Sequence, residues 1–169
     1  MAKRAVRIIA ALILPIILLC GCAAEEKRLS DKEYRTAIES AWDKYINSVL
    51  DLIEITPLTV DEAAVSEFAK NAEKAQPALK MREQSLKEFS EINPPEKYEA
   101  LHKQLIAAMD AWEYEQLELH RKMFGVKSVA ELEEITKRIS EHAENSSENT
   151  FPMVYLKIEK ALNADNVGE

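Results

Sequence analysis

The chain contains four long segments in which apolar residues recur at steps of three and four, the spacing of one face of an α-helix. The first segment runs from about Asp31 to Ile55, and its apolar positions are Tyr34, Ile38, Trp42, Tyr45, Ile46, Val49, Leu52 and Ile53. In the second segment they are Val65, Phe68, Ala72, Ala75, Leu79, Leu86 and Phe89. Arg82 fills one position of this second stripe, and the phase does not change across Pro77. The spacing predicts two amphipathic helices, the second kinked at Pro77 but continuous.

The third and fourth segments repeat the pattern with one interruption. The third segment has its apolar positions at Tyr98, Leu101, Leu105, Ala108, Met109, Trp112, Leu119 and Met123. We expect it to end at Gly125 in a left-handed cap. The fourth segment has Leu132, Ile135, Ile139, Val154, Ile158 and Leu162. A polar stretch at residues 144–152 interrupts it, and we expect a kink at Pro152 or a short break within one rod.

Each segment is preceded by a residue that typically caps a helix, with a glutamate three positions later. The four pairs are Ser30 and Glu33, Thr59 and Glu62, Asn93 and Glu96, and Ser128 and Glu131. Such a pair predicts a capping box, in which each side chain bonds the backbone N–H of the other residue. In the third pair, Pro94 and Pro95 are expected in the first helical turn, where a missing N–H costs nothing.

The fold class follows from the length and order of these segments. Helices of about 25–35 residues joined by short loops pack as antiparallel neighbours. Only two glycines, Gly125 and Gly168, follow residue 22, which argues against a β-rich fold with many tight turns. We therefore predict an all-α fold, an antiparallel up-down four-helix bundle with kinked long helices, over residues 30–162. Residues 163–169 are expected to form a flexible tail.

The first residues have a different composition. Lys3, Arg4 and Arg7 precede an apolar run of residues 8–19, which is shorter than the about 20 residues that cross a bilayer. A basic start and a short apolar run are typical of a secretory signal. The run ends in "LCGC", residues 19–22, which resembles the lipobox of bacterial lipoproteins.

The lipobox resemblance implies that Cys22 is diacylated and becomes the new N-terminus. Residues 1–21 would then be a lipoprotein signal peptide and residues 22–29 an acylated tether. Cys20 fits less well, because Leu19 would occupy the small position before the cleavage site. The protein would lie on the extracytoplasmic face of a cell membrane, in a Gram-positive or an outer membrane. The alternative is an uncleaved anchor helix with two incidental cysteines.

The negative net charge of the chain argues against one class of partner. The formal net charge is −8, and without residues 1–21, which carry three basic residues, 19 Lys and Arg stand against 30 Asp and Glu. A net charge of −11 argues against nucleic acid as a partner. With Cys22 acylated, no free thiol remains for redox chemistry or zinc binding.

The best candidates for chemistry are weak. Glu99 and His102 form one quarter of a ferritin-like di-iron set, which requires a second such pair that the sequence lacks. Asp110 and Glu113 are interpreted as a solvated face, as are Glu131, Glu133 and Glu134, with weak calcium binding as the alternative. Trp42 and Trp112 lie on apolar stripes and are expected in the core. We therefore predict no catalytic residues, no metal site and no cofactor.

A second resemblance covers residues 92–112, "INPPEKYEALHKQLIAAMDAW". The segment is similar to one in uncharacterised secreted or lipid-anchored helical proteins of Gram-positive bacteria. In those proteins, a Pro-Pro turn precedes a helix with an inward leucine and a histidine. The resemblance implies a related fold and a location in the cell envelope, and no activity.

These observations favour a non-enzymatic, membrane-anchored helical-bundle module that binds an envelope protein or peptide. The alternative is a small-molecule carrier or sensor with an apolar cavity near Trp42, Trp112 or the prolines. A partner is expected to dock on Leu58, Phe124 and Val126, which lie at chain turns far from the membrane. Alternatively, Leu58 packs beside the helix cap and Val126 closes the helix that ends at Gly125.

Overall fold

The computed structural model describes residues 27–145 and 149–166, in which all regular secondary structure is helical. The elements are α2 (Asp31–Ile55), α3 (Glu62–Glu91), the 3-10 helix η1 (Glu96–Tyr98), α4 (Glu99–Ala108), the π-helix η2 (Met109–Glu113), α5 (Tyr114–Met123), α6 (Val129–Asn145) and α7 (Phe151–Asn166). The prediction of an all-α fold is confirmed for these residues. The predicted signal peptide, Cys20, Cys22 and residues 167–169 lie outside them.

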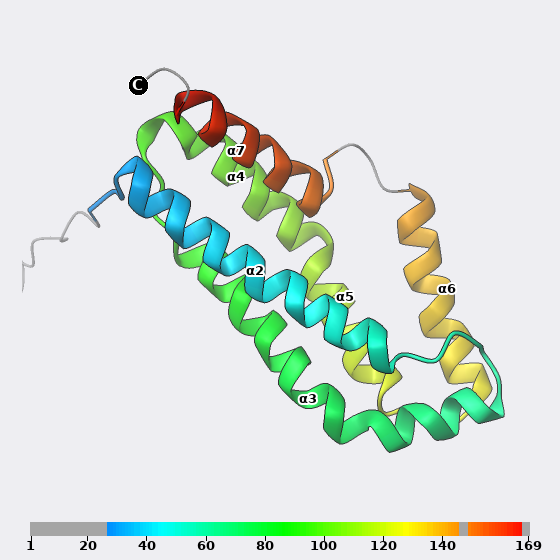
Figure 1. Cartoon of the computed structure of the whole chain (residues 1–169). Helices are drawn as coiled ribbons and strands as arrows, with labels where there is room; N and C mark the ends of the chain where they lie inside the picture. The colour runs from blue at the N-terminus through cyan, green and yellow to red at the C-terminus, as the bar shows by residue number, and fades with distance from the viewer. Residues whose placement is uncertain (1–26, 146–148, 167–169) are drawn as a thin grey trace, which may run out of the picture.

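The helices pack in pairs around a shared core. Helix α3 packs along α2, α7 packs on α4, and α5 lies against both α3 and α6. Figure 1 shows the start of α2 and the end of α7 at one end of the molecule, which we call the proximal end. The α2–α3 connection and the α5–α6 turn lie at the opposite, distal end (Figure 1). At the proximal end, the Leu29 N–H donates to the Asn93 carbonyl at 3.1 Å.

Helix α2 begins with the predicted capping box, but α3 does not. The Glu33 N–H donates to Ser30 Oγ at 3.3 Å, and the Ser30 N–H donates to Glu33 Oε2 at 2.8 Å. At α3 the cap is Asp61, whose Oδ1 accepts from the Ala64 N–H at 2.8 Å. The prediction of Thr59 as the cap is therefore wrong. A carboxylate directly before the helix accepts this bond and also complements the positive end of the helix dipole.

Of the other two capping predictions, one is wrong and one holds in part. Pro95 precedes η1 and no side chain caps it, so the box from Asn93 is wrong. At α6, the Glu131 N–H donates to Ser128 Oγ at 3.3 Å, while the Glu131 carboxylate accepts from the preceding Lys127 N–H. Gly125 has no positive φ, so the left-handed cap is also wrong. Its N–H instead donates to the carbonyl three residues earlier at 2.9 Å, a tight turn that any residue can adopt.

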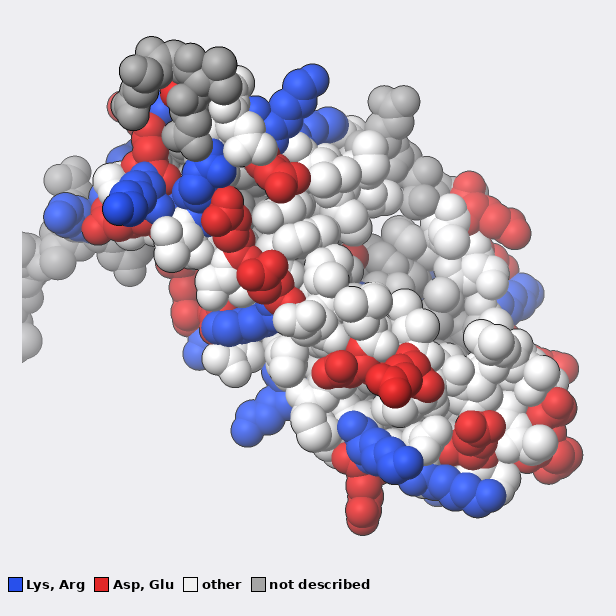
Figure 2. Space-filling view, in the orientation of Figure 1, with Lys and Arg blue, Asp and Glu red and all other residues white. Residues whose placement is uncertain are grey.

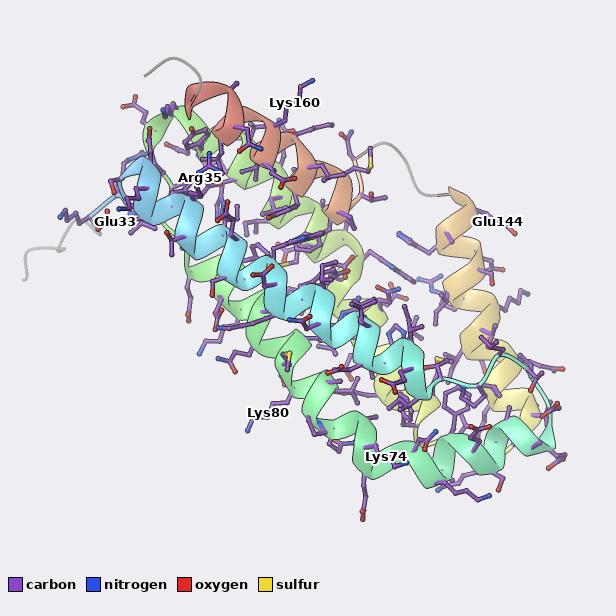
Figure 3. All side chains as sticks on the ribbon, in the orientation of Figure 1. Glu33, Arg35, Lys74, Lys80, Glu144 and Lys160 are labelled. Carbon is purple, nitrogen blue, oxygen red and sulfur yellow. The ribbon has the colours of Figure 1, made fainter. Side chains whose placement is uncertain are left out.

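Helix α3 continues through Pro77, as the unbroken phase of its apolar stripe predicts. The exposed Pro77 ring faces solvent, and Figure 1 shows that the helix bends along its length. Lys74 and Lys80, on either side of the proline, point away from the bundle (Figure 3). Helix α3 contacts both α5 and α6, and its first half runs beneath α6 at the distal end (Figure 1).

The π-helix η2 changes which residues of the third segment face the core. A turn of a π-helix is wider than an α-helical turn and contains an extra residue. Every later residue is therefore rotated about the helix axis relative to its position in a regular α-helix. Glu113 and Leu117 are buried as a result. Trp112, which was expected in the core, is only partly buried and stacks on His142 of α6 with ring centroids 3.6 Å apart. The regular stripe predicted for this segment is therefore wrong at Trp112 and misses Glu113 and Leu117, whereas Leu119 and Met123 are buried as predicted.

The fourth segment forms two separate helices. Helices α6 and α7 point in different directions and pack on different partners, so the prediction of one rod is wrong (Figure 1). Pro152 lies in the first turn of α7, where its missing N–H has no helical partner to lose. Helix α7 then packs on the bundle through Tyr155, which stacks on Trp42 with ring centroids 3.8 Å apart.

Candidate functional site

A buried ion pair connects α3 to the π-helix. Arg82 is 2% exposed and Glu113 is 4% exposed, and Arg82 Nη2 lies 2.7 Å from Glu113 Oε2. The same carboxylate oxygen accepts from the Tyr45 hydroxyl of α2 at 2.8 Å. The interpretation of Glu113 as part of a solvated face is therefore wrong, because η2 turns it inward. Arg82 in the apolar stripe was the sequence signal that an acidic partner lies opposite.

Arg82 is surrounded by further polar groups but is only partly satisfied. Its guanidinium lies over the Tyr45 ring, 5.2 Å from the centroid, and Nη2 also donates to Gln116 Oε1. Arg82 Nε is buried and has no hydrogen-bond partner among the described residues. A buried donor without an acceptor costs about 1–3 kcal/mol. The cluster therefore contains one buried hydrogen-bond donor, Arg82 Nε, that has no acceptor among the described residues.

The protonation of His120 follows from its neighbours. Its Nδ1 lies 2.8 Å from the Gln116 carbonyl, which only accepts, so Nδ1 carries the proton. Arg82 Nη1, at 3.4 Å from Nδ1, then meets another donor and forms no hydrogen bond with it. Burial and the neighbouring Arg82 charge lower the pKa of His120 to about 4, against the Gln116 carbonyl, which raises it. His120 is therefore neutral at pH 7.

A cavity of about 300 Å³ opens beside this cluster, between the end of α2, α3 and α5. We call it the distal pocket. The residues that line it are Tyr45, Val49, Leu52, Ile53, Thr56, Leu58, Arg82, Gln116 and His120. Tyr45, Arg82, Gln116 and His120 belong to the polar cluster, and the other lining residues come from α2 and the connection after it. Ile53 is 63% exposed and Leu58 is 98% exposed, so both are open to a partner.

The residues predicted to dock a partner do not share one environment. Leu58 is exposed, so the alternative in which it packs beside the α3 cap is wrong. Phe124 and Val126 are buried, and Phe124 packs edge-on against Phe68 with ring centroids 5.3 Å apart. Phe124 and Val126 are thus not exposed for docking: Phe68 of α3 covers Phe124, and Val126 lies at a hollow between α5 and α6. The other exposed apolar side chains of α2 and the connection after it are Leu50, Ile53 and Val60, of which Ile53 lines the same pocket as Leu58.

Glu99 and His102 do not form one site. Glu99 is bonded to Lys103 at 2.5 Å and to Arg28 at 2.7 Å, and these cations lower its pKa to about 2. His102 is buried, with Nδ1 3.2 Å from the Tyr34 hydroxyl, and burial lowers its pKa. Within residues 27–145 and 149–166, no group of three or more His, Cys, Asp or Glu side chains is placed to hold a metal ion.

A larger hollow of about 720 Å³ lies between α5 and α6. Exposed charged side chains of both signs line most of it, including Glu115 and Arg138, which pair at 2.8 Å. Figure 2 shows a mixture of acidic and basic side chains on the face in view as well, interspersed with uncharged surface. This hollow lacks the buried, incompletely bonded polar group that the distal pocket has.

The distal pocket is therefore lined by apolar side chains of α2, which form its wall, and by the polar cluster around Arg82, which we call its floor. The exposed Ile53 and Leu58 form its edge, which we call its lip. Comparison of the chain with protein-family models, with curated proteins and with solved structures finds no match. Among the helices of the described residues, none is long and apolar enough to cross a membrane.

Proposed function

We propose that the chain is a lipid-anchored, non-enzymatic helical-bundle module of the cell envelope, with the distal pocket as its binding site. Cys22 carries the anchor, and residues 22–29 form a short tether. The helices make a modified four-helix bundle, in which α4, η2 and α5 form the third rod and α6 and α7 share the fourth place. Leu29 lies at the proximal end, so the distal pocket points away from the membrane.

One observation carries this proposal: the distal pocket is large enough for a ligand and has apolar walls with a few convergent polar groups. Binding sites in proteins typically have volumes of about 300–1,000 Å³ and this mixed lining. Ile53 and Leu58, which line the pocket, are at the same time exposed apolar side chains. The first candidate partner is therefore an envelope protein or peptide that inserts an apolar side chain.

The second candidate is a small-molecule carrier or sensor, and the polar floor favours it. Arg82 is buried and presents an unused donor, which a flat protein–protein contact does not require. The whole cavity is also large enough to enclose a compact ligand rather than one side chain.

The polar groups of the pocket suit binding better than catalysis. His120, with a pKa of about 4, is a weak base at neutral pH. Burial raises the pKa of the Tyr45 hydroxyl well above its usual value, so it stays protonated. The Thr56 hydroxyl donates to the Leu52 carbonyl at 2.7 Å and is not held by a base. These groups lack an activated nucleophile.

Photo-crosslinking in cells tests the proposal. A photoreactive side chain at Leu58 is expected to give a discrete product, while one at Met153, which is 44% exposed on α7, gives none. Ile53→Glu should abolish the product without changing the melting temperature, because Ile53 lines the same pocket and an exposed side chain contributes little to core packing. Equal products from both positions, or a product that survives Ile53→Glu, would contradict the proposal.

A further inference from the structure

The floor of the distal pocket offers more hydrogen-bond donors than acceptors. A guanidinium has five N–H donors, and the two on Arg82 Nη2 are used by Glu113 and Gln116. Arg82 Nε has no acceptor among the described residues, and Nη1 faces the protonated Nδ1 of His120. An acceptor atom on a ligand in the pocket would therefore receive a hydrogen bond from Arg82.

The charge of the floor is balanced. Arg82 and Glu113 form an ion pair, and His120 is neutral at pH 7. Among the described residues that line the pocket, the ionisable side chains are Arg82, His120 and the protonated Tyr45, and Glu113 pairs with Arg82 without lining the pocket itself. A ligand with a net charge would lose its hydration without gaining a counter-charge, which is costly in a buried site. The balance therefore favours an uncharged ligand.

The remaining walls select an apolar body. Val49, Leu52, Ile53 and Leu58 line the pocket from the end of α2 and the connection that follows. We infer that the distal pocket binds a small uncharged molecule with an apolar body and one acceptor oxygen, such as a ketone, amide or ester. The acceptor receives a hydrogen bond from Arg82, and the body lies along the α2 wall. This inference rests on the proposed binding function of the pocket.

Matched probes on one carbon ring test the inference. The full chain, anchored in lipid nanodiscs, is titrated with cyclohexanone, methylcyclohexane, cyclohexanecarboxylate and cyclohexylammonium, with empty nanodiscs as the blank. Ligand-observed NMR reports the affinities. A hydrogen bond from a charged donor gives cyclohexanone an advantage of about tenfold or more over each of the other probes. Intermolecular contacts to the Val49 methyl groups locate the bound ring.

Two variants separate recognition of the oxygen from binding of the ring. Val49→Phe fills the pocket and should abolish binding of all probes. Arg82→Met/Glu113→Gln removes the donors while keeping the charge balance, and should reduce the preference for cyclohexanone to below about twofold. If this variant fails to fold, the Val49→Phe comparison and the contacts to Val49 still decide the outcome.

Each other result overturns the inference. Tighter binding of the carboxylate or the ammonium probe would show that the site selects a charge. Equal binding of the ketone and the hydrocarbon would show that water satisfies Arg82, while the pocket still binds apolar groups as proposed. Binding that persists in Val49→Phe would place the probes elsewhere. Absence of binding by every probe would also overturn it, and crosslinking at Leu58 then decides the proposed function separately.

Discussion

The buried pair of Arg82 and Glu113 makes the sharpest prediction about stability. Arg82→Met removes the guanidinium and leaves the Glu113 carboxylate buried with only the Tyr45 hydroxyl as a donor. Glu113→Gln leaves Arg82 buried without its counter-charge. Breaking a buried pair by removing one partner costs about 3–5 kcal/mol, so we expect each single variant to lose this much. That is a large part of the about 5–15 kcal/mol that stabilises a typical domain.

The double variant Arg82→Met/Glu113→Gln should be more stable than the sum of the two losses predicts. The methionine fills the space of the arginine stem, and the new amide oxygen still accepts from Tyr45. No charge remains buried, so we expect a coupling free energy of about 3 kcal/mol between the two positions. Urea unfolding at pH 7, followed by the far-ultraviolet circular dichroism of the helices, measures it.

The ion pair between Lys44 and Glu88 is a matched control. It also joins two helices, with Nζ 2.6 Å from Oε1, but its side chains are 39% and 29% exposed. Exposed pairs are worth about 0–1 kcal/mol, so Lys44→Met/Glu88→Gln should show a coupling below about 1 kcal/mol. A coupling for Arg82 and Glu113 as small as that of the control would refute the inward turn of Glu113 in the π-helix.

Three further predictions concern pH, the anchor and independent folding. The lowered pKa of His120 means that the unfolded state takes up a proton as the pH falls through about 6.5, while the folded state does so only near 4. The free energy of unfolding should therefore fall by at most about 3 kcal/mol between pH 7 and pH 4. His120→Gln should reduce this loss and His142→Gln should not. The same pH dependence of the free energy of unfolding in both variants, measured by urea unfolding, would contradict the prediction. Cys22→Ala should abolish fatty-acid labelling and leave unprocessed precursor while Cys20→Ala is labelled normally, and label retained in Cys22→Ala would refute the assignment. A chain that starts at Ala23 should be helical and melt cooperatively, and a chelator that lowers its melting temperature by several degrees would reveal a stabilising metal.

The sequence predicted the fold where helical spacing is regular. The bounds of α2 and the continuity of α3 across Pro77 follow from apolar residues that keep one phase. A helix is stabilised mainly by the packing of its apolar face, so an unbroken apolar stripe predicts a continuous helix even where a proline removes a backbone hydrogen bond. By contrast, the fourth segment contains both a polar stretch and Pro152, and spacing alone did not distinguish a kink from a change of direction.

The candidate site was only partly predictable. Arg82 stood out as a charged residue within an apolar stripe, but its partner Glu113 was assigned to the solvated surface. That error has one physical cause: the π-helix adds a residue to a turn, and spacing arguments assume 3.6 residues per turn throughout. Phe124 and Val126 are buried although they lie at a chain turn, because the spacing along one helix does not reveal which side chains from other segments pack on the turn.

One measurement tests most directly that the distal pocket is the binding site. A photoreactive side chain replaces Ile53 at the lip of the pocket, or Leu156 on α7 as a control; the native side chains are 63% and 49% exposed. After irradiation in cells, the intact mass of the chain reveals any adduct, whether protein, peptide or small molecule. We predict a discrete adduct from position 53 that disappears in Val49→Phe, and none from position 156. The same adducts from both positions, or an adduct at position 53 that Val49→Phe does not affect, would contradict this account.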